Sequence, residues 1–260
     1  MNHSLAGQVA LVTGAGNALG IGFAIAKALA SDGATVLISS TTERIHERAA
    51  ELQALGCNSV GIVADLMESG AAERLVRATT ELSGHLEICV NNAGMIAVGG
   101  TPATSMIDST TDEGWHEGIE RNLTTCFAVT RSAIAAMRSR KYGRIINVGS
   151  TSGSLQAFAG DVAYHAAKAG MLGLTRAVAL EVANDGITVN ALAPGWIASG
   201  SQPHGEQLAG TLTPMGRSGT PDEVAAAARF LADPLASYVT GQLLVVDGGN
   251  SLPEDRGWRP

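Results

Sequence analysis

The sequence predicts an α/β fold with a doubly wound parallel sheet of about seven strands and helices on both faces. Two observations lead to this fold class: short apolar runs rich in β-branched residues recur along the chain, and longer segments with helical spacing separate them. Strands and helices that alternate in this way form parallel sheets covered on both sides. Because 260 residues with 45% hydrophobic content can bury the core of one α/β domain, we expect residues 1–260 to form a single domain.

Seven runs have the length and composition of buried strands, and they are residues 9–13, 35–39, 60–64, 87–92, 144–150, 188–194 and 243–248. Helical spacing follows the first run, where the apolar residues are Ile21, Ile25, Ala28 and Leu29. We expect substrate loops at about 95–110, 151–161 and 195–213, of which the first and last are rich in Gly, Pro, Ser and Thr. Loops at the carboxyl ends of parallel strands form the ligand crevice of such sheets.

Composition and charge narrow the class of partner. The 17 Lys and Arg residues are outnumbered by 24 Asp and Glu residues and do not cluster, which argues against a nucleic-acid-binding face and favours a small-molecule ligand. No apolar stretch has membrane-spanning length and the first residues lack the pattern of an export signal, so we expect no membrane insertion. Cys57, Cys89 and Cys126 are widely spaced, which is typical of reduced thiols in a cytoplasmic protein, and the six histidines form no metal-binding pattern.

The stretch TGAGNALGIG, residues 13–22, follows the first expected strand and has the composition of a phosphate-binding turn. Gly14 is the glycine that turns the chain, because the apolar run ends at Thr13. The helix begins near Gly20, and Gly22 allows that helix to approach the sheet closely. Five residues therefore lie within an enlarged turn, and the amide groups at the start of the helix can hold a phosphate. A tight turn without a ligand is the alternative.

Tyr164 and Lys168 are four positions apart in a helical segment, so their side chains share one face and can act as an acid/base pair. A free phenol has a pKa of about 10, and a nearby cation lowers it. Such a pair also occurs by chance. Two more polar residues accompany it: Ser150 ends an expected strand, and Asn122 lies in the helical segment IERNLTTCF.

These features together resemble the short-chain dehydrogenase/reductase family, and within it the branch of 3-oxoacyl-acyl-carrier-protein reductases. The resemblance spans nearly the whole chain and rests on TGAGNALGIG, Asp65, NNAG (91–94), Asn122, Ser150, YHAAK (164–168), PGWIAS (194–199) and GQLLVVDGG (241–249). It implies a Rossmann-type fold, a homotetramer, and hydride transfer between a nicotinamide cofactor and a ketone or secondary alcohol.

The resemblance also implies individual roles. Tyr164 would donate the proton in carbonyl reduction, Ser150 would polarise the carbonyl, Lys168 would hold the nicotinamide ribose and lower the phenol pKa, and Asn122 would hold a water in the proton relay. Asp65 would bond the adenine edge. The full set of expected cofactor-binding residues is Gly14, Asn17, Gly20, Ile21, Gly22, Ser40, Asp65, Leu66, Asn92, Ala93, Gly94, Tyr164, Lys168, Pro194, Gly195, Ile197 and Ser199. No metal is expected.

Two departures from the family pattern bear on the reaction. The enlarged turn resembles that of bacterial enoyl reductases, but those enzymes space the catalytic Tyr and Lys further apart, whereas three residues separate them here, which favours carbonyl reduction. Tyr164 follows Ser150 by fourteen positions, one more than is usual, so Thr151 or Ser152 is an alternative to Ser150. Ser150 is preferred because the strand pattern ends there. His165 points about 100° away from Tyr164 around the helix, which predicts a supporting or surface position.

The second expected strand ends in a way that bears on the cofactor. NAD-specific enzymes of this fold carry an acid there that bonds the ribose 2′-hydroxyl, and this chain has Ser40. The neighbouring hydroxyl groups and Arg44 can donate to a 2′-phosphate, which favours NADP(H) over NAD(H). Against this, the enlarged turn contains no Lys or Arg.

The sequence therefore predicts an NAD(P)(H)-dependent oxidoreductase, with a 3-oxoacyl thioester reductase as one form. A dehydrogenase of a cyclic or sugar-derived alcohol is an alternative, and a nucleotide-binding sensor without turnover is another. Small apolar residues at 132–137 and 169–183 support the expected tetramer.

Overall fold

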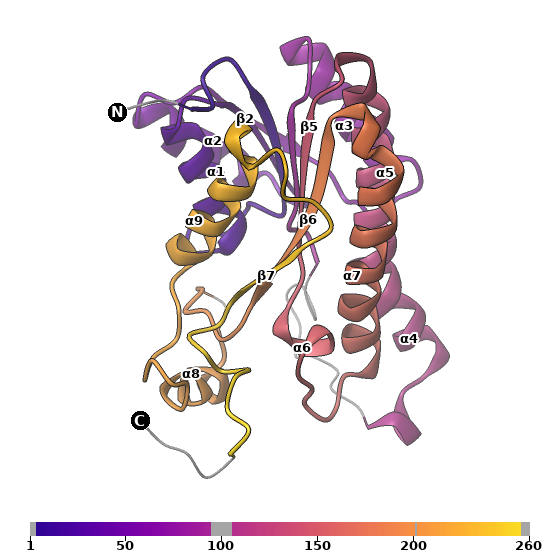
Figure 1. Ribbon diagram of the computed structural model, residues 1–260, viewed down its shortest axis with the longest axis vertical. Helices are drawn as coiled ribbons and strands as arrows, with labels where there is room; N and C mark the ends of the chain where they lie inside the picture. The colour runs from indigo at the N-terminus through magenta and orange to yellow at the C-terminus, as the bar shows by residue number, and fades with distance from the viewer. Residues whose placement is uncertain (1–3, 95–105, 201, 256–260) are drawn as a thin grey trace.

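The computed structural model describes residues 4–94, 106–200 and 202–255, which build a sheet of seven parallel strands in the order β3-β2-β1-β4-β5-β6-β7 (Figure 1). The strands are β1 (Val9–Thr13), β2 (Thr35–Ser40), β3 (Ser59–Val63), β4 (Ile88–Asn91), β5 (Gly143–Val148), β6 (Ile187–Pro194) and β7 (Leu243–Val246). Each of the seven apolar runs predicted from the sequence forms one of these strands, with ends that differ by at most two residues.

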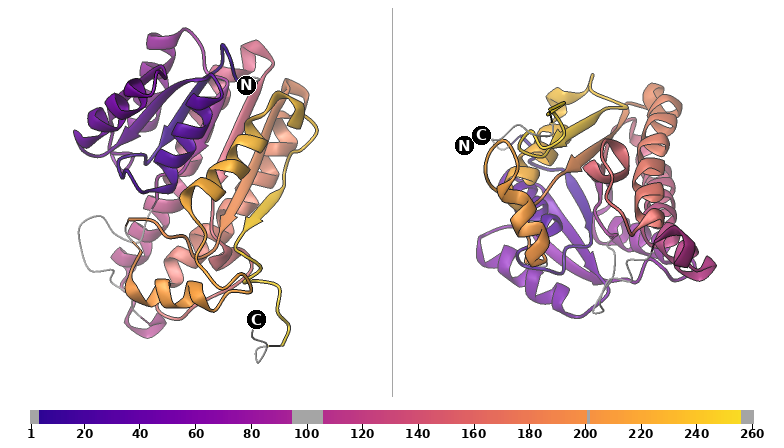
Figure 2. Two further views of the ribbon diagram at one scale, coloured as in Figure 1. Left: turned by 90° about the vertical axis from the view of Figure 1, so that its left-hand side faces the viewer. Right: turned by 90° about the horizontal axis from the view of Figure 1, so that it is seen from below.

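Helices cover both faces of the sheet. They are α1 (Ile21–Ser31), α2 (Arg44–Ala54), α3 (Ala71–Ser83), α4 (Asp112–Ile119), α5 (Thr125–Met137), α6 (Thr151–Ser154), α7 (Val162–Val182), α8 (His204–Thr211) and α9 (Pro221–Ala232). Helices α1, α2 and α9 lie on one face, and α3, α5 and α7 lie on the other (Figures 1 and 2). Within the described part of the chain, no helix is long and apolar enough to cross a membrane.

The sheet separates two apolar clusters, because successive side chains of a strand point to opposite faces. In β1, Val12 belongs to the cluster under α1, α2 and α9, whereas Leu11 belongs to the cluster under α3, α5 and α7. Strands that are buried on both faces favour apolar side chains at most positions, which explains why their sequences are nearly continuous apolar runs.

The strand order reverses between β1 and β4, and the connections that leave these two strands diverge there. A crevice forms at such a switch point, at the carboxyl ends of the strands. The predicted loops differ from the structure: segment 151–161 contains α6 and segment 195–213 contains α8. Most of the predicted loop at 95–110 lies outside the described residues.

Candidate functional site

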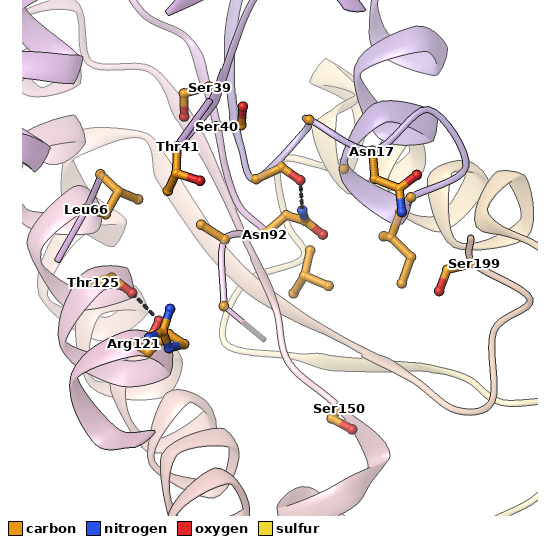
Figure 3. Close-up of a pocket in the computed structure, with 18 of the residues that line it drawn as sticks. Asn17, Ser39, Ser40, Thr41, Leu66, Asn92, Arg121, Thr125, Ser150 and Ser199 are labelled. Atoms are coloured by element: carbon orange, nitrogen blue, oxygen red, sulfur yellow. Dashed lines mark hydrogen bonds between the residues drawn. The ribbon is translucent and has the colours of Figure 1, made fainter. Parts of the chain in front are cut away.

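A cavity of about 380 Å³ opens at the carboxyl ends of the strands, and its walls come from the glycine turn, the segments that follow β2 to β6, and the start of α7. Figure 3 shows Ser40 and Thr41 at one end of this cavity and Ser150 at the other. The cavity is lined by every residue that the sequence analysis assigned to the cofactor, from Gly14 in the turn to Ser199 after β6. Their binding to a nucleotide stays a prediction.

The glycine turn packs tightly on the end of β4. Gly14 has a φ of +70°, and a Cβ atom there would lie 2.8 Å from the Cα atom of Ala93, so a larger residue does not fit. The Asn92 side-chain amide donates to the carbonyl oxygens of Thr13 and Gly14, at 3.1 and 3.0 Å. A Cβ atom on Gly22 would lie 2.4 Å from that amide nitrogen. Asn92 therefore holds the turn against the strand.

The additional residues of the enlarged turn are held by local hydrogen bonds. The Asn17 Oδ1 atom accepts from the Leu19 amide at 3.0 Å, and the Asn17 carbonyl accepts from the Gly20 amide at 2.9 Å. The Leu19 carbonyl accepts from the Gly200 amide at 3.3 Å, which joins the turn to the segment that leads into α8. No local sequence signal indicated this last contact, because the two residues are far apart in the chain.

Hydroxyl groups and a guanidinium group line the end of the cavity after β2. The Ser40 Oγ atom donates to the Thr42 carbonyl at 3.1 Å, and the exposed Arg44 donates from Nε to the Thr42 hydroxyl at 3.4 Å. A Cβ atom on Gly16 would lie 2.8 Å from the Ser40 Oγ atom, so the turn reaches Ser40 only because residue 16 is glycine. These donors fit a phosphate group.

Helix α7 places Tyr164 and Lys168 in the cavity wall. The Asp161 carboxylate caps the helix and accepts from the Tyr164 amide at 3.0 Å, which sets Tyr164 in the first turn. Lys168 lies one turn later, with its Nζ atom 5.5 Å from the centre of the Tyr164 ring. The Lys168 side chain is only 3% exposed, and its ammonium group donates to the Val148 carbonyl at 3.1 Å.

The pKa of Tyr164 is raised in this structure, and a lowering contribution from Lys168 stays a prediction. Burial raises the pKa of Tyr164, a hydrogen bond with Ser150 lowers it, and the charges of Glu206 and Asp161 raise it further. Burial also lowers the pKa of Lys168 to about 8. Removal from water disfavours the charged form of each group, which raises the pKa of the phenol and lowers that of the ammonium group.

Ser150 lines the cavity beside Tyr164, and its Oγ atom accepts from the Ser152 amide at 3.1 Å. Thr151 is buried, and neither Thr151 nor Ser152 belongs to the cavity wall formed by the described residues. The geometry thus supports Ser150 over the two alternatives.

His165 does not belong to the cavity wall formed by the described residues. It holds the segment between Ser150 and Tyr164 in place. Its Nε2 atom accepts from the Phe158 amide at 3.1 Å, and its Nδ1 atom donates to the Asp161 carbonyl at 2.6 Å. His165 therefore has the supporting position expected from its direction on the helix.

Asn122 is the one predicted catalytic residue that the structure does not bring into the wall of this cavity, as the described residues define it. It lies in a π-helical segment, Glu120–Thr124, which its sequence did not reveal. Its side chain is 1% exposed and donates to the Gly118 carbonyl at 3.1 Å, while its Oδ1 atom has no hydrogen-bond partner among the described residues. A Cβ atom on Gly94 would lie 2.9 Å from this oxygen, so the side chain packs beneath the cavity.

A buried polar network, not found from the sequence, ties the strands under Lys168 to α5 and α7. The Asn91 side-chain amide donates at 2.8 Å to both Thr130 and Asn147, and Asn147 donates to Thr175 at 2.9 Å. Cys126 also contacts Asn147, and burial raises the pKa of its thiol to about 12. Because these groups satisfy one another, the floor of the site is held in a single arrangement.

Among the cavity residues that the sequence analysis did not assign to the site, three have polar or charged side chains: Arg121, Thr125 and Glu206. Arg121 precedes Asn122 and forms an ion pair with Glu117. Glu206 lies in the first turn of α8. Of these three residues, only Arg121 could have been suspected from the sequence, because it stands next to the predicted catalytic residue Asn122.

Comparisons with known proteins agree with this geometry. A family model described as "Enoyl-(Acyl carrier protein) reductase" matches residues 14–251. The chain is 40% identical over 250 residues to the 3-oxoacyl-[acyl-carrier-protein] reductase FabG of Vibrio cholerae, which covers 95% of this chain and 98% of that protein. It is 37% identical over 247 residues to the FabG protein of Escherichia coli, which covers 94% of this chain and 97% of that protein.

Solved structures also match nearly the whole length of this chain. A dehydrogenase/reductase from Sinorhizobium meliloti matches with a TM-score of 0.86 and 34% identity, over 96% of this chain and 97% of that chain. A putative gluconate dehydrogenase from Agrobacterium tumefaciens matches with a TM-score of 0.86 and 31% identity, over 97% of this chain and 99% of that chain.

Proposed function

This chain belongs to the short-chain dehydrogenase/reductase family and is an NAD(P)-dependent oxidoreductase, and we propose that it reduces the ketone of a 3-oxoacyl thioester with NADPH. The observation that carries the proposal is the cavity that Ser150, Tyr164 and Lys168 share with the glycine turn. The ketone substrate is supported by the names of the FabG relatives and by the three-residue spacing of Tyr164 and Lys168.

In the proposed reaction, the nicotinamide supplies a hydride to the carbonyl carbon when the cofactor is bound. Tyr164 donates its phenolic proton to the carbonyl oxygen, because burial keeps the phenol protonated. Ser150 is hydrogen-bonded to Tyr164 and orients the carbonyl oxygen at the same place. Lys168 donates to the Val148 carbonyl, and its remaining N–H groups would hold the ribose of a bound cofactor. Asn122 holds a water through its unpartnered oxygen, which is the remaining part of the proposed relay.

NADP(H) is the proposed form of the cofactor. Ser40, Thr41, Thr42 and Arg44 line the end of the cavity where a 2′-phosphate would lie, and these side chains supply donors and a positive charge. Gly16 allows the turn to lie against Ser40, since a side chain at residue 16 would meet Ser40. Gly14, Gly20 and Gly22 line the cavity at the start of α1, where helix amides would hold the pyrophosphate of a bound cofactor.

Oxidation of a sugar-derived alcohol is the second candidate, and the likeness to a putative gluconate dehydrogenase favours it. A rate screen distinguishes the two: 3-oxoacyl thioesters, cyclic ketones and sugar-derived alcohols are each assayed with NADP(H) and NAD(H). We expect the largest kcat/KM for a 3-oxoacyl thioester with NADPH. Turnover of a sugar-derived alcohol alone would establish the second candidate, and cofactor binding without any turnover would indicate a sensor.

We also propose that the protein is a cytoplasmic homotetramer. Helix α7 exposes Ala169, Gly173, Ala177 and Leu180 along one side, next to the exposed Arg176, and these small and apolar residues can pack against a second copy. The described cysteines are free thiols, which supports a reducing compartment.

A further inference from the structure

Charged side chains that line the cavity are nearly all engaged by neighbours. The Arg44 Nε atom donates to Thr42 at 3.4 Å, the Lys168 Nζ atom donates to Val148 at 3.1 Å, Asp65 accepts from the Met67 amide at 3.0 Å, and Arg121 pairs with Glu117. Glu206 differs from these four residues. Within the described ranges, its carboxylate has no hydrogen bond and no ion pair, although it is half-buried in the cavity wall.

Glu206 lies on the substrate side of the cavity. It belongs to the first turn of α8, in the segment that follows β6 and covers the carboxyl ends of the strands (Figures 1 and 2). It lies close enough to Tyr164 for its charge to act on the phenol, and burial raises the pKa of Glu206 itself. The carboxylate therefore faces the region in which the ketone must meet the proton donor.

An unpaired carboxylate that is partly removed from water is unfavourable unless a ligand satisfies it. A hydroxyl or amide N–H group on the substrate would provide the missing hydrogen bond, whereas a substrate carboxylate at this place would be repelled. We propose that Glu206 is a specificity-determining residue, which selects ketones that carry a neutral hydrogen-bond donor near the carbonyl group and rejects those that carry a carboxylate there.

This inference rests on the proposed function, because it takes Tyr164 as the group at which the ketone is reduced. A plain 3-oxoacyl chain has no donor near its carbonyl groups. The donor of a thioester substrate is then an amide N–H of the thiol-bearing arm or a hydroxyl group on the acyl chain.

Two matched pairs of small ketones test the proposal, with NADPH in excess. Ethyl acetoacetate and acetoacetate differ in charge, and 4-hydroxy-2-butanone and 2-butanone differ in one hydroxyl group. For wild type we expect kcat/KM to favour the ester over the acid and the hydroxyketone over the plain ketone. Glu206→Gln should reduce the ester-to-acid ratio about tenfold, because the charge that repels the acid is lost. Glu206→Ala should reduce the hydroxyketone-to-ketone ratio about tenfold, since a hydrogen bond to a charged group contributes about that factor.

Gln207→Glu is the matched control, because it adds a negative charge at the next position of α8, where the side chain is exposed. This variant should keep both wild-type ratios. Glu206→Asp retains the charge and should keep the ordering within each pair. Circular dichroism and NADPH binding show whether each variant is folded.

Ratios in Glu206→Gln and Glu206→Ala that stay within twofold of wild type would overturn the proposal. If wild type reduces none of the four ketones, the same ratios are taken from their dissociation constants in the presence of NADP⁺. This test can be read separately from the proposed function. If the variants change the two ratios but wild type does not reduce 3-oxoacyl thioesters, Glu206 keeps its role in specificity and the thioester is excluded as the substrate.

Discussion

The Lys168 ammonium nitrogen lies 5.5 Å from the centre of the Tyr164 ring, and burial acts on both groups in the direction that removes charge. It raises the pKa of Tyr164 and lowers that of Lys168 to about 8. Burial therefore favours the protonated phenol of Tyr164, which is the form that donates a proton in carbonyl reduction. The reverse oxidation needs the phenolate, so it should become faster relative to reduction as the pH rises.

Tyr164→Phe should abolish reduction while cofactor binding survives, because the ring remains and the transferable proton is lost. General acid catalysis typically contributes about 10² to 10⁴ in rate, so kcat should fall by at least about a hundredfold. Steady-state kinetics and NADPH fluorescence titration measure the two properties. A variant with more than about a tenth of the wild-type kcat would remove Tyr164 from the role of proton donor.

Lys168→Met should inactivate the enzyme, weaken cofactor binding and change the pH dependence of stability. In the folded protein the pKa of Lys168 is about 8, below its ordinary value of 10.5, so between these pH values the unfolded chain holds more protons. The wild-type free energy of unfolding should therefore rise relative to Lys168→Met across this window, by on the order of 3 kcal/mol. Below pH 8 the difference between the two proteins should be constant.

Urea unfolding of the cofactor-free proteins at several pH values measures this difference. A difference in unfolding free energy that falls between pH 8 and 10.5 would contradict the depressed pKa of Lys168. Cofactor affinity equal to that of wild type would contradict contact between Lys168 and the ribose.

Arg44→Ala should lower kcat/KM for NADPH about tenfold and leave that for NADH unchanged, because its guanidinium group is the charged donor beside Ser40. Lys27→Ala is a suitable control, since Lys27 is exposed on α1 and has no place in the cavity wall formed by the described residues. A wild-type preference for NADH would overturn the choice of cofactor. If the preference for NADPH survives in Arg44→Ala, phosphate recognition lies with the hydroxyl groups and the backbone of the turn.

Glu206→Gln should shift the pH dependence of reduction. The negative charge of Glu206 contributes to the raised pKa of Tyr164, so its removal lowers that pKa. Reduction requires the protonated phenol, and its kcat/KM should therefore begin to decline at a lower pH than in wild type. Superimposable pH profiles for the two enzymes would show that Glu206 does not act on the phenol.

Leu180→Glu should disrupt the proposed tetramer. The Leu180 side chain is 84% exposed, and a Cβ atom on nearby Gly173 would meet nothing within 4 Å, so the face is free to pack against another copy. Light scattering at micromolar concentration should give a tetramer for wild type and a smaller species for the variant. A monomeric wild type would refute the assembly.

The amino-acid sequence by itself determined the strands, the glycine turn and the helical pair, because each depends on neighbours along the chain. A strand buried on both faces favours a nearly continuous apolar run, as in residues 9–12. Gly14 was identifiable because a sharp turn directly after a strand requires a positive φ. Tyr164 and Lys168 were identifiable because four positions equal about one helical turn.

Only the tertiary structure decided which distant residues share the cavity and in which direction their pKa values shift. The contact of Gly16 with Ser40, the hydrogen bond from Gly200 to Leu19 and the approach of Glu206 to Tyr164 each join segments that no local pattern connects. The raised pKa of Tyr164 was not predictable for the same reason. Spacing within a helix shows that a cation is near, but burial depends on every element packed around the group, and burial is the largest cause of the shift here.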